Sequence, residues 1–122
     1  PLPWAWMSET DMDYYAQQFG AGGFTGPLNW YRACDLNWIS NRQFIGQHIH
    51  QPCLFIAGRN DPVIEMSGPG ALEFMRKMVP NLKDLLLLEN AGHFVQLEQA
   101  TPVSEAIVHF LERTVRPTNS SQ

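Results

Sequence analysis

The sequence predicts an α/β fold in which parallel strands with flanking helices follow a helical segment. Two short apolar runs, residues 52–58 and 83–90, lack polar alternation, which is typical of strands buried on both faces of a parallel sheet. A helical pattern follows each run, and this alternation indicates α/β layers with right-handed crossovers. We therefore expect a helical part over residues 1–48, an α/β core over 49–116 and a loose tail over 117–122.

Helix signals dominate the first part of the chain. Ser8 and Asp11 have the spacing of a capping box, and the helix that they predict continues until Gly20. Pro27 suits the first position of a second helix. Apolar side chains then follow at helical spacing, namely Leu28, Tyr31, Cys34 and Trp38.

Two further helices are expected to flank the strands. Residues 70–80, "GALEFMRKMVP", predict a helix that ends before Pro80, with one apolar face turned toward the sheet. The residues of that face are Leu72, Met75, Met78 and Val79. Residues 101–115 predict the last helix, with Thr101 as its cap and Pro102 at its first position.

Composition excludes several classes of protein. Hydrophobic residues make up 44% of the 122 residues and charged ones 16%, which is typical of a globular chain rather than a disordered one. The formal charge of -4 offers no basic surface, so we expect no nucleic-acid partner. No apolar run is long enough for a membrane span. With two cysteines and no secretory signal, we expect reduced thiols and a cytoplasmic location.

One carboxylate and one histidine follow the two predicted strands. Asp61 lies in "AGRNDPV" after the first strand, and His93 lies in "NAGHF" after the second. Because the carboxyl ends of neighbouring parallel strands meet at one edge of a sheet, we expect these loops to lie together. Asp61 could then accept a hydrogen bond from one ring nitrogen of His93 and leave the other free to act as a general base.

A metal site is an alternative reading of "HIHQPC". His48, His50 and Cys53 lie within six residues of one another, and His48 and His50 share a face of an extended segment. Three ligands without a fourth, directly before a buried strand, fit an ordinary loop better. We therefore predict neither a metal nor a cofactor.

The strand–loop motifs resemble a known family. "LFIAGRNDPV" followed by "LENAGHFVQLEQATPVSEAIVHFL" is similar to the carboxyl-terminal part of the α/β-hydrolase fold, with its acid and histidine in the usual order. Upstream, "GFTGPLNWYR" closely resembles the lid of soluble epoxide hydrolases. The resemblance covers nearly the whole chain and implies that the helical part is a portion of this lid.

The resemblance also implies a role for individual residues. Tyr31 resembles the lid tyrosine that hydrogen-bonds the epoxide oxygen, Asp61 the acid of the catalytic triad, and His93 the base that activates water. Phe94 and Trp30 would line the pocket for a small apolar epoxide. Tyr14 and Tyr15 are expected to be structural.

The family's nucleophile is not found in this chain. In the family an aspartate stands on a glycine-flanked elbow, and no such G-x-[SD]-x-G motif occurs here. We therefore expect a carboxyl-terminal piece of an epoxide hydrolase that is inactive alone and needs an amino-terminal part to complete its sheet. The alternatives are a serine esterase or haloalkane dehalogenase of the same fold, and a non-catalytic ligand-binding or inert fragment.

Overall fold

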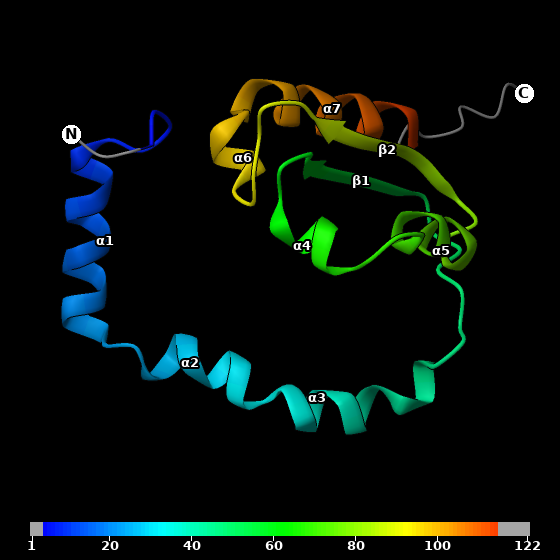
Figure 1. Cartoon of the computed structure of the whole chain (residues 1–122), viewed down its shortest axis with the longest axis horizontal. Coiled ribbons are helices and arrows are strands. Elements are labelled where there is room, and N and C mark those ends of the chain that lie inside the picture. The colour runs from blue at the N-terminus through cyan, green and yellow to red at the C-terminus, as the bar shows by residue number, and fades with distance from the viewer. Residues whose placement is uncertain (1–3, 115–122) are drawn as a thin grey trace, which may run out of the picture. The chain divides into compact units, whose positions relative to one another are not determined.

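A computed structural model describes residues 4–114 of the chain and divides it into two compact units, residues 1–47 and 48–122. The first unit is helical and the second contains a parallel sheet (Figure 1). The predicted tail over 117–122 lies outside the described residues.

The first unit consists of consecutive helices. They are α1 (Glu9–Gly22), α2 (Thr25–Arg32), α3 (Cys34–Ser40) and the 3₁₀ helix η1 (Asn41–Phe44). The predicted capping box is confirmed at α1, where the Ser8 hydroxyl accepts from the Asp11 amide and the Asp11 carboxylate accepts from the Ser8 amide. That carboxylate also accepts from the Ser8 hydroxyl at 2.6 Å. The α1 helix ends where Gly23 takes a positive φ of 67°.

The second helix differs from the prediction in two ways. It begins at Thr25 rather than at Pro27, so the proline lies inside the first turn, where its missing amide hydrogen costs no helical hydrogen bond. The helical pattern through Trp38 is also interrupted at Ala33, which ends α2 and caps α3. Helical spacing persists across such a break, so the pattern alone does not reveal it.

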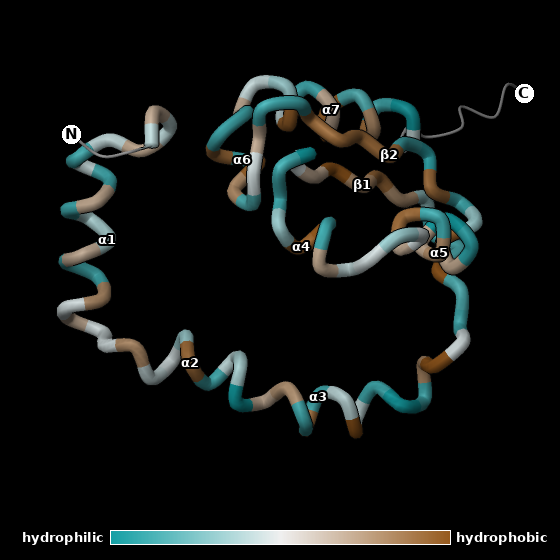
Figure 2. The backbone as a smooth tube through the Cα atoms, viewed as in Figure 1, coloured by the Kyte–Doolittle hydropathy of each residue, from teal (hydrophilic) through white to brown (hydrophobic). Residues whose placement is uncertain are grey.

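The second unit is organised around two parallel strands, β1 (Cys53–Gly58) and β2 (Leu82–Leu88). Between them the chain forms α4 (Pro62–Met66) and α5 (Ala71–Met78), and after β2 it forms α6 (Val95–Glu98) and α7 (Ala100–Thr114). This order confirms the predicted strand–helix alternation. Figure 2 shows mostly hydrophobic residues along both strands.

Two details of the strands and the last helix correct the prediction. Neither strand is buried on both faces, because only Ala57 and Gly58 in β1 are buried and the other strand residues, except exposed Lys83, are half-buried. The described residues form a sheet of only two strands, so each strand is also an edge of the sheet. The last helix begins at Ala100, so Thr101 is a helical residue and not the cap; Val115 lies outside the described residues.

The apolar face of α5 agrees with the prediction. Leu72, Met75 and Met78 are half-buried and Val79 is buried, whereas Phe74 on the same helix is 64% exposed. The short helices α4 and α6 were not predicted. An aspartate before a proline at Asp61–Pro62 is a standard helix-start signal that points to α4.

The small core of the second unit lies at the carboxyl ends of the strands. Ala91, Val95 and Val103 form a buried cluster against the partly buried Ile56 and Leu88. The arginine of α7, Arg113, pairs with Asp84 of β2, which ties the helix to the sheet. The loops that carry Asp61 and His93 therefore rest directly on the best-packed part of the unit.

Candidate active site

A close approach of two backbones brings the loops after β1 and β2 together. Gly58, the last residue of β1, lies so near the second loop that a Cβ atom there would be 2.2 Å from the carbonyl oxygen of Gly92 and 2.3 Å from that of Ala91. Only glycine leaves room for this approach. The amide of Asn60 then donates to the Ala91 carbonyl oxygen at 2.9 Å, which joins one loop to the other.

The turn that presents His93 uses a strained but permitted backbone. Asn90 adopts a positive φ of 57°, in the left-handed region that asparagine tolerates better than most residues. At the base of the loops, Arg59 after β1 pairs with Glu89 after β2, with Nε and Oε1 2.5 Å apart. Both strand ends thus turn at once into loops that are tied to each other.

Asp61 is held in place by the helix that it caps. Its Oδ1 atom accepts a hydrogen bond from the amide of Val63 at 2.9 Å, and Pro62 occupies the first turn of α4. A side chain at an N-cap is restricted to orientations that face the helix amides. The side chain of Asp61 is also only 12% exposed, although it lies in a loop.

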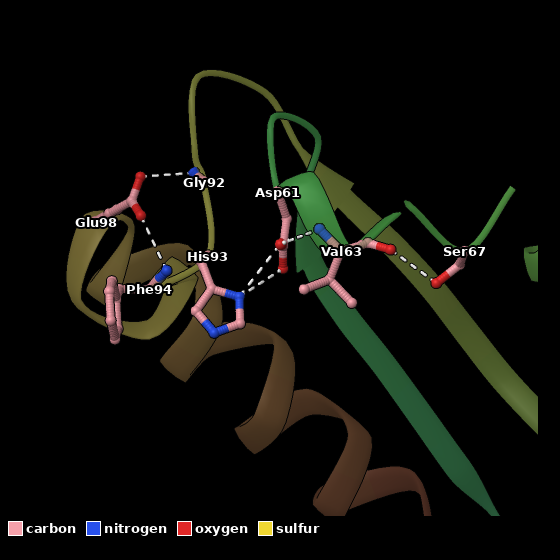
Figure 3. A network of polar contacts seen from close by, with 7 residues as sticks. All are labelled: Asp61, Val63, Ser67, Gly92, His93, Phe94 and Glu98. Carbon is pink, nitrogen blue, oxygen red and sulfur yellow. Dashed lines mark hydrogen bonds and ion pairs between the residues drawn. The ribbon is translucent and has the colours of Figure 1, made fainter. Parts of the chain in front are cut away.

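The geometry of the Asp61–His93 pair agrees with the hydrogen bond predicted from sequence. The Nδ1 atom of His93 lies 3.2 Å from both carboxylate oxygens of Asp61. Figure 3 shows the ring edge-on to the carboxylate, with the second ring nitrogen pointing away from it. The histidine side chain is 57% exposed, so that nitrogen is accessible.

This arrangement is suited to proton transfer. In the tautomer that carries its proton on Nδ1, His93 donates to Asp61 and Nε2 keeps a lone pair that can take a proton from water or a hydroxyl group. The carboxylate stabilises the imidazolium that would form. The ring of Phe94 meets that of His93 edge-on, with centroids 5.2 Å apart.

Two of the predicted site residues belong to the first unit. Trp30 and Tyr31 are adjacent residues of α2, with 75% and 71% of their surfaces exposed. In the second unit, in contrast, His93 lies within hydrogen-bonding distance of Asp61 and in ring contact with Phe94. The structure thus brings together three of the five predicted site residues within one unit.

The sequence reasoning missed one residue of the site, Glu98. Its carboxylate accepts hydrogen bonds from the amides of Gly92 and Phe94, on either side of His93. Phe94 caps α6, and a glutamate that reaches back to the amide of a cap residue is half of a capping box. Glu98 stands one position later than the usual box, so its spacing gave only a weak signal.

Other candidate sites are not supported. Among the described residues, 4–114, no group of three or more histidine, cysteine, aspartate or glutamate side chains could hold a metal ion. An apolar hollow of about 490 Å³ lies between β1, α4 and α5, lined by residues that include Phe55, Val63 and Met75. Neither Asp61 nor His93 lines it.

No helix within the described range is long and apolar enough to cross a membrane.

Solved structures identify the class to which this arrangement belongs. A potato (Solanum tuberosum) epoxide hydrolase I matches 89% of the chain with a TM-score of 0.79 and 36% sequence identity. A Vigna radiata epoxide hydrolase mutant matches 93% with a TM-score of 0.82 and 32% identity. The chain therefore has, over the part that it covers, the α/β-hydrolase fold of these proteins, which confirms the predicted fold class.

Sequence comparison gives the same result. The chain is 36% identical to epoxide hydrolase 1 of Siraitia grosvenorii, over 89% of its own length and 36% of the relative's. It is also 36% identical to epoxide hydrolase A of Mycobacterium tuberculosis, over 88% of its own length and 32% of the relative's. No protein-family model matches the chain. The chain is thus a homologue of epoxide hydrolases, and it spans about a third of the length of these curated relatives.

Proposed function

We propose that this chain supplies the acid–histidine pair and part of the lid of an epoxide hydrolase that converts apolar epoxides to vicinal diols without a cofactor. The observation that carries the proposal is the placement of His93 Nδ1 at 3.2 Å from both oxygens of Asp61, in a chain homologous to epoxide hydrolases. A ring oriented in this way is a ready general base.

The proposed reaction has two steps. In the first, a nucleophilic carboxylate attacks an epoxide carbon, the carbon–oxygen bond breaks, and the phenol of Tyr31 gives its proton to the ring oxygen. In the second, His93 Nε2 takes a proton from water, whose oxygen adds to the ester carbonyl. The acyl–oxygen bond then breaks, and His93 returns the proton to the leaving alkoxide, which departs as the diol. The proton left on the nucleophile's carboxyl group restores the Tyr31 phenol. Asp61 completes the catalytic triad by stabilising the imidazolium. Trp30 and Phe94 would contact the apolar part of the substrate.

The nucleophile must come from polypeptide outside this chain. We call the assembly of the chain with that polypeptide, which we propose precedes it, the complete protein. Without a nucleophile no ester forms, and His93 has nothing to hydrolyse. The isolated chain should therefore release no diol from an epoxide.

Three alternatives depend on the same missing residue. A serine at that position would favour a serine esterase, whereas an aspartate is compatible with both an epoxide hydrolase and a haloalkane dehalogenase. A glycine or alanine would leave a non-catalytic ligand-binding protein. The names of the relatives favour an epoxide as the substrate. The amino-acid sequence upstream of this chain would show directly whether the nucleophile is a serine, an aspartate or absent.

We also propose a cytoplasmic location for the complete protein. Cys34 is exposed and Cys53 is half-buried, and both are free thiols. Unpaired cysteines fit a reducing compartment. Fractionation of cells that express the complete protein tests this, and recovery in an oxidising compartment would contradict it.

The role of the pair is tested by replacing Asp61 with Asn in the complete protein. Asparagine caps helices as well as aspartate does, so α4 should remain intact. It carries no charge to stabilise the imidazolium, so ester breakdown in a single turnover should slow by about 10²-fold or more. The matched control is Glu65→Gln, an exposed residue of α4. An unchanged rate for Asp61→Asn would rule out the pair as the hydrolytic machinery.

A further inference from the structure

Glu98 holds the backbone on both sides of His93. Its Oε2 atom accepts from the amide of Gly92 at 2.6 Å and its Oε1 atom accepts from the amide of Phe94 at 3.0 Å (Figure 3). The two donors belong to the residues immediately before and after the histidine. One carboxylate thus holds the 91–92 and 93–94 peptide groups, which flank the peptide group that joins Gly92 to His93.

The fit of the carboxylate against this turn is close. A Cβ atom at Gly92 would lie 3.2 Å from Oε1 of Glu98, so the glycine allows the carboxylate to reach the backbone. Both bonds have an ionised acceptor, which makes them stronger than bonds between neutral groups. Glu98 is half-buried, and water competes less for such bonds than for exposed ones.

The histidine side chain itself has little packing to fix it. It is 57% exposed, and the described contacts of its ring are with Asp61 and the edge of Phe94. The direction of its Cα–Cβ bond is therefore set by the backbone. Asn60 holds that backbone upstream, through the Ala91 carbonyl oxygen, and Glu98 holds it around the histidine.

We propose that Glu98 is a positioning residue for His93: its carboxylate fixes the turn so that Nδ1 stays against Asp61 and Nε2 stays turned outward. This inference rests on the proposed function, because it concerns the base of that reaction. Glu98 does not touch the reacting atoms. It acts by keeping the ring in the one orientation that the second step uses.

Glutamine separates this role from simple packing. A glutamine at position 98 has nearly the same shape as glutamate but only one acceptor oxygen, and its amide nitrogen would face a second N–H donor. Glu98→Gln should therefore release one of the two amides, whereas Glu98→Ala should release both. The control is Glu105→Gln, an exposed residue of α7.

The experiment is nuclear magnetic resonance of the complete protein with ¹⁵N-labelled histidine, glycine and phenylalanine. In Glu98→Ala, the Gly92 and Phe94 amides should exchange with solvent about tenfold faster or more. The ¹⁵N shifts of the His93 ring should move away from the Nδ1-protonated tautomer toward the average of a mobile ring. Glu98→Gln should give a smaller change of the same sign, and Glu105→Gln none.

The ring signals decide the inference. If the two amides exchange faster but the His93 ring keeps its tautomer, Glu98 holds only the backbone and the inference fails. It also fails if neither signal changes. Should Glu98→Ala unfold, the ring signals of Glu98→Gln test the inference by the same criterion. No substrate is involved, so a complete protein that forms no ester would overturn the proposed function while the ring measurement still tests Glu98.

Discussion

The side-chain hydrogen bonds within each unit of the chain differ greatly in the sequence separation of their partners. In residues 48–122, side-chain hydrogen bonds join positions about 30 apart, as between Asp61 and His93, Arg59 and Glu89, and Asp84 and Arg113. In residues 1–47, the side-chain bonds of Ser8, Arg32 and Gln47 reach only three or four positions along the chain. The long-range hydrogen bonds of the second unit place side chains from different segments against one another. The short-range hydrogen bonds of the first unit stabilise only local helices and turns.

Burial follows the same division, because all buried residues within the described range 4–114 belong to the second unit. Trp30, Trp38 and Ile45 in the first unit are each at least two-thirds exposed, while the second unit buries Ala91, Val95 and Val103 beneath its loops. The geometry of the Asp61–His93 pair is thus set by residues of the second unit alone. The role of Tyr31 instead depends on surfaces beyond its helix, and substitutions in each unit should reveal that difference.

The largest effect is expected from His93→Gln in the complete protein. A carboxylate nucleophile is already ionised at neutral pH and attacks without a base, so the first step should proceed. Hydrolysis of the ester should slow by about 10² to 10⁴-fold because water is no longer activated. Intact mass spectrometry after mixing with epoxide should show close to one adduct per protein.

The same variant separates the enzyme alternatives. In a serine esterase, the histidine also deprotonates the nucleophile, so its replacement would suppress the adduct. A folded His93→Gln variant that binds epoxide but forms no adduct would count against the aspartyl ester. Normal diol release would remove His93 from the site altogether.

Tyr31→Phe tests whether the helical unit contributes chemistry. Loss of the phenol removes a hydrogen bond to the epoxide oxygen as negative charge develops there, so ester formation should slow by about 10²-fold. Rapid mixing measures that step directly in the complete protein. Tyr15→Phe in α1 is the matched control and should leave the rate unchanged. Equal rates for both variants would show that Tyr31 is a packing residue.

Gly58→Ala should disturb the loops of the second unit. The added Cβ atom would meet backbone carbonyl oxygens at 2.2 and 2.3 Å, which a side-chain rotation cannot relieve. We expect the free energy of unfolding in urea to fall by about 1 to 3 kcal/mol, with slower ester hydrolysis. Gly26→Ala is the control, because no atom lies within 4 Å of the new Cβ atom there. Equal stability of both variants would contradict the close approach.

The smallest effect concerns the start of α1. Hydrogen bonds from the Ser8 side chain and then from its amide hold the pKa of the Asp11 carboxyl below its usual 3.8. A lowered folded-state pKa means that the cap stabilises α1 above that usual value and is lost as the pH falls through the lowered pKa. Ser8→Ala should bring the pKa back toward 3.8 in a carbonyl ¹³C titration. Ser40→Ala should not, and a pKa unaffected by Ser8→Ala would contradict the capping box.

Sequence patterns predicted the parts of this molecule that follow from local periodicity and from the topology of parallel strands. The apolar runs predicted both strands, and strand order with parallel pairing predicted that Asp61 and His93 would meet. The sequence patterns did not predict the features that depend on a single residue. The break at Ala33 leaves the helical period unchanged, and Gly58 matters because the distant backbone of residues 91–92 passes beside it. Glu98 reaches the amides of Gly92 and Phe94 from a position one later than the usual capping box. Such contacts have no period to detect.

The closeness in sequence of the acid, the histidine and Glu98 has a consequence for how such enzymes diverge. All three lie between residues 61 and 98: Asp61 in the loop after β1, His93 in the loop after β2 and Glu98 at the end of α6. A single stretch of gene therefore encodes the whole hydrolytic half of the proposed reaction, apart from the nucleophile. Recombination can exchange that stretch as a block, and point mutation can alter the nucleophile elsewhere without disturbing it. A change of the nucleophile alone would then alter which bond is attacked and leave the water-activating residues in place.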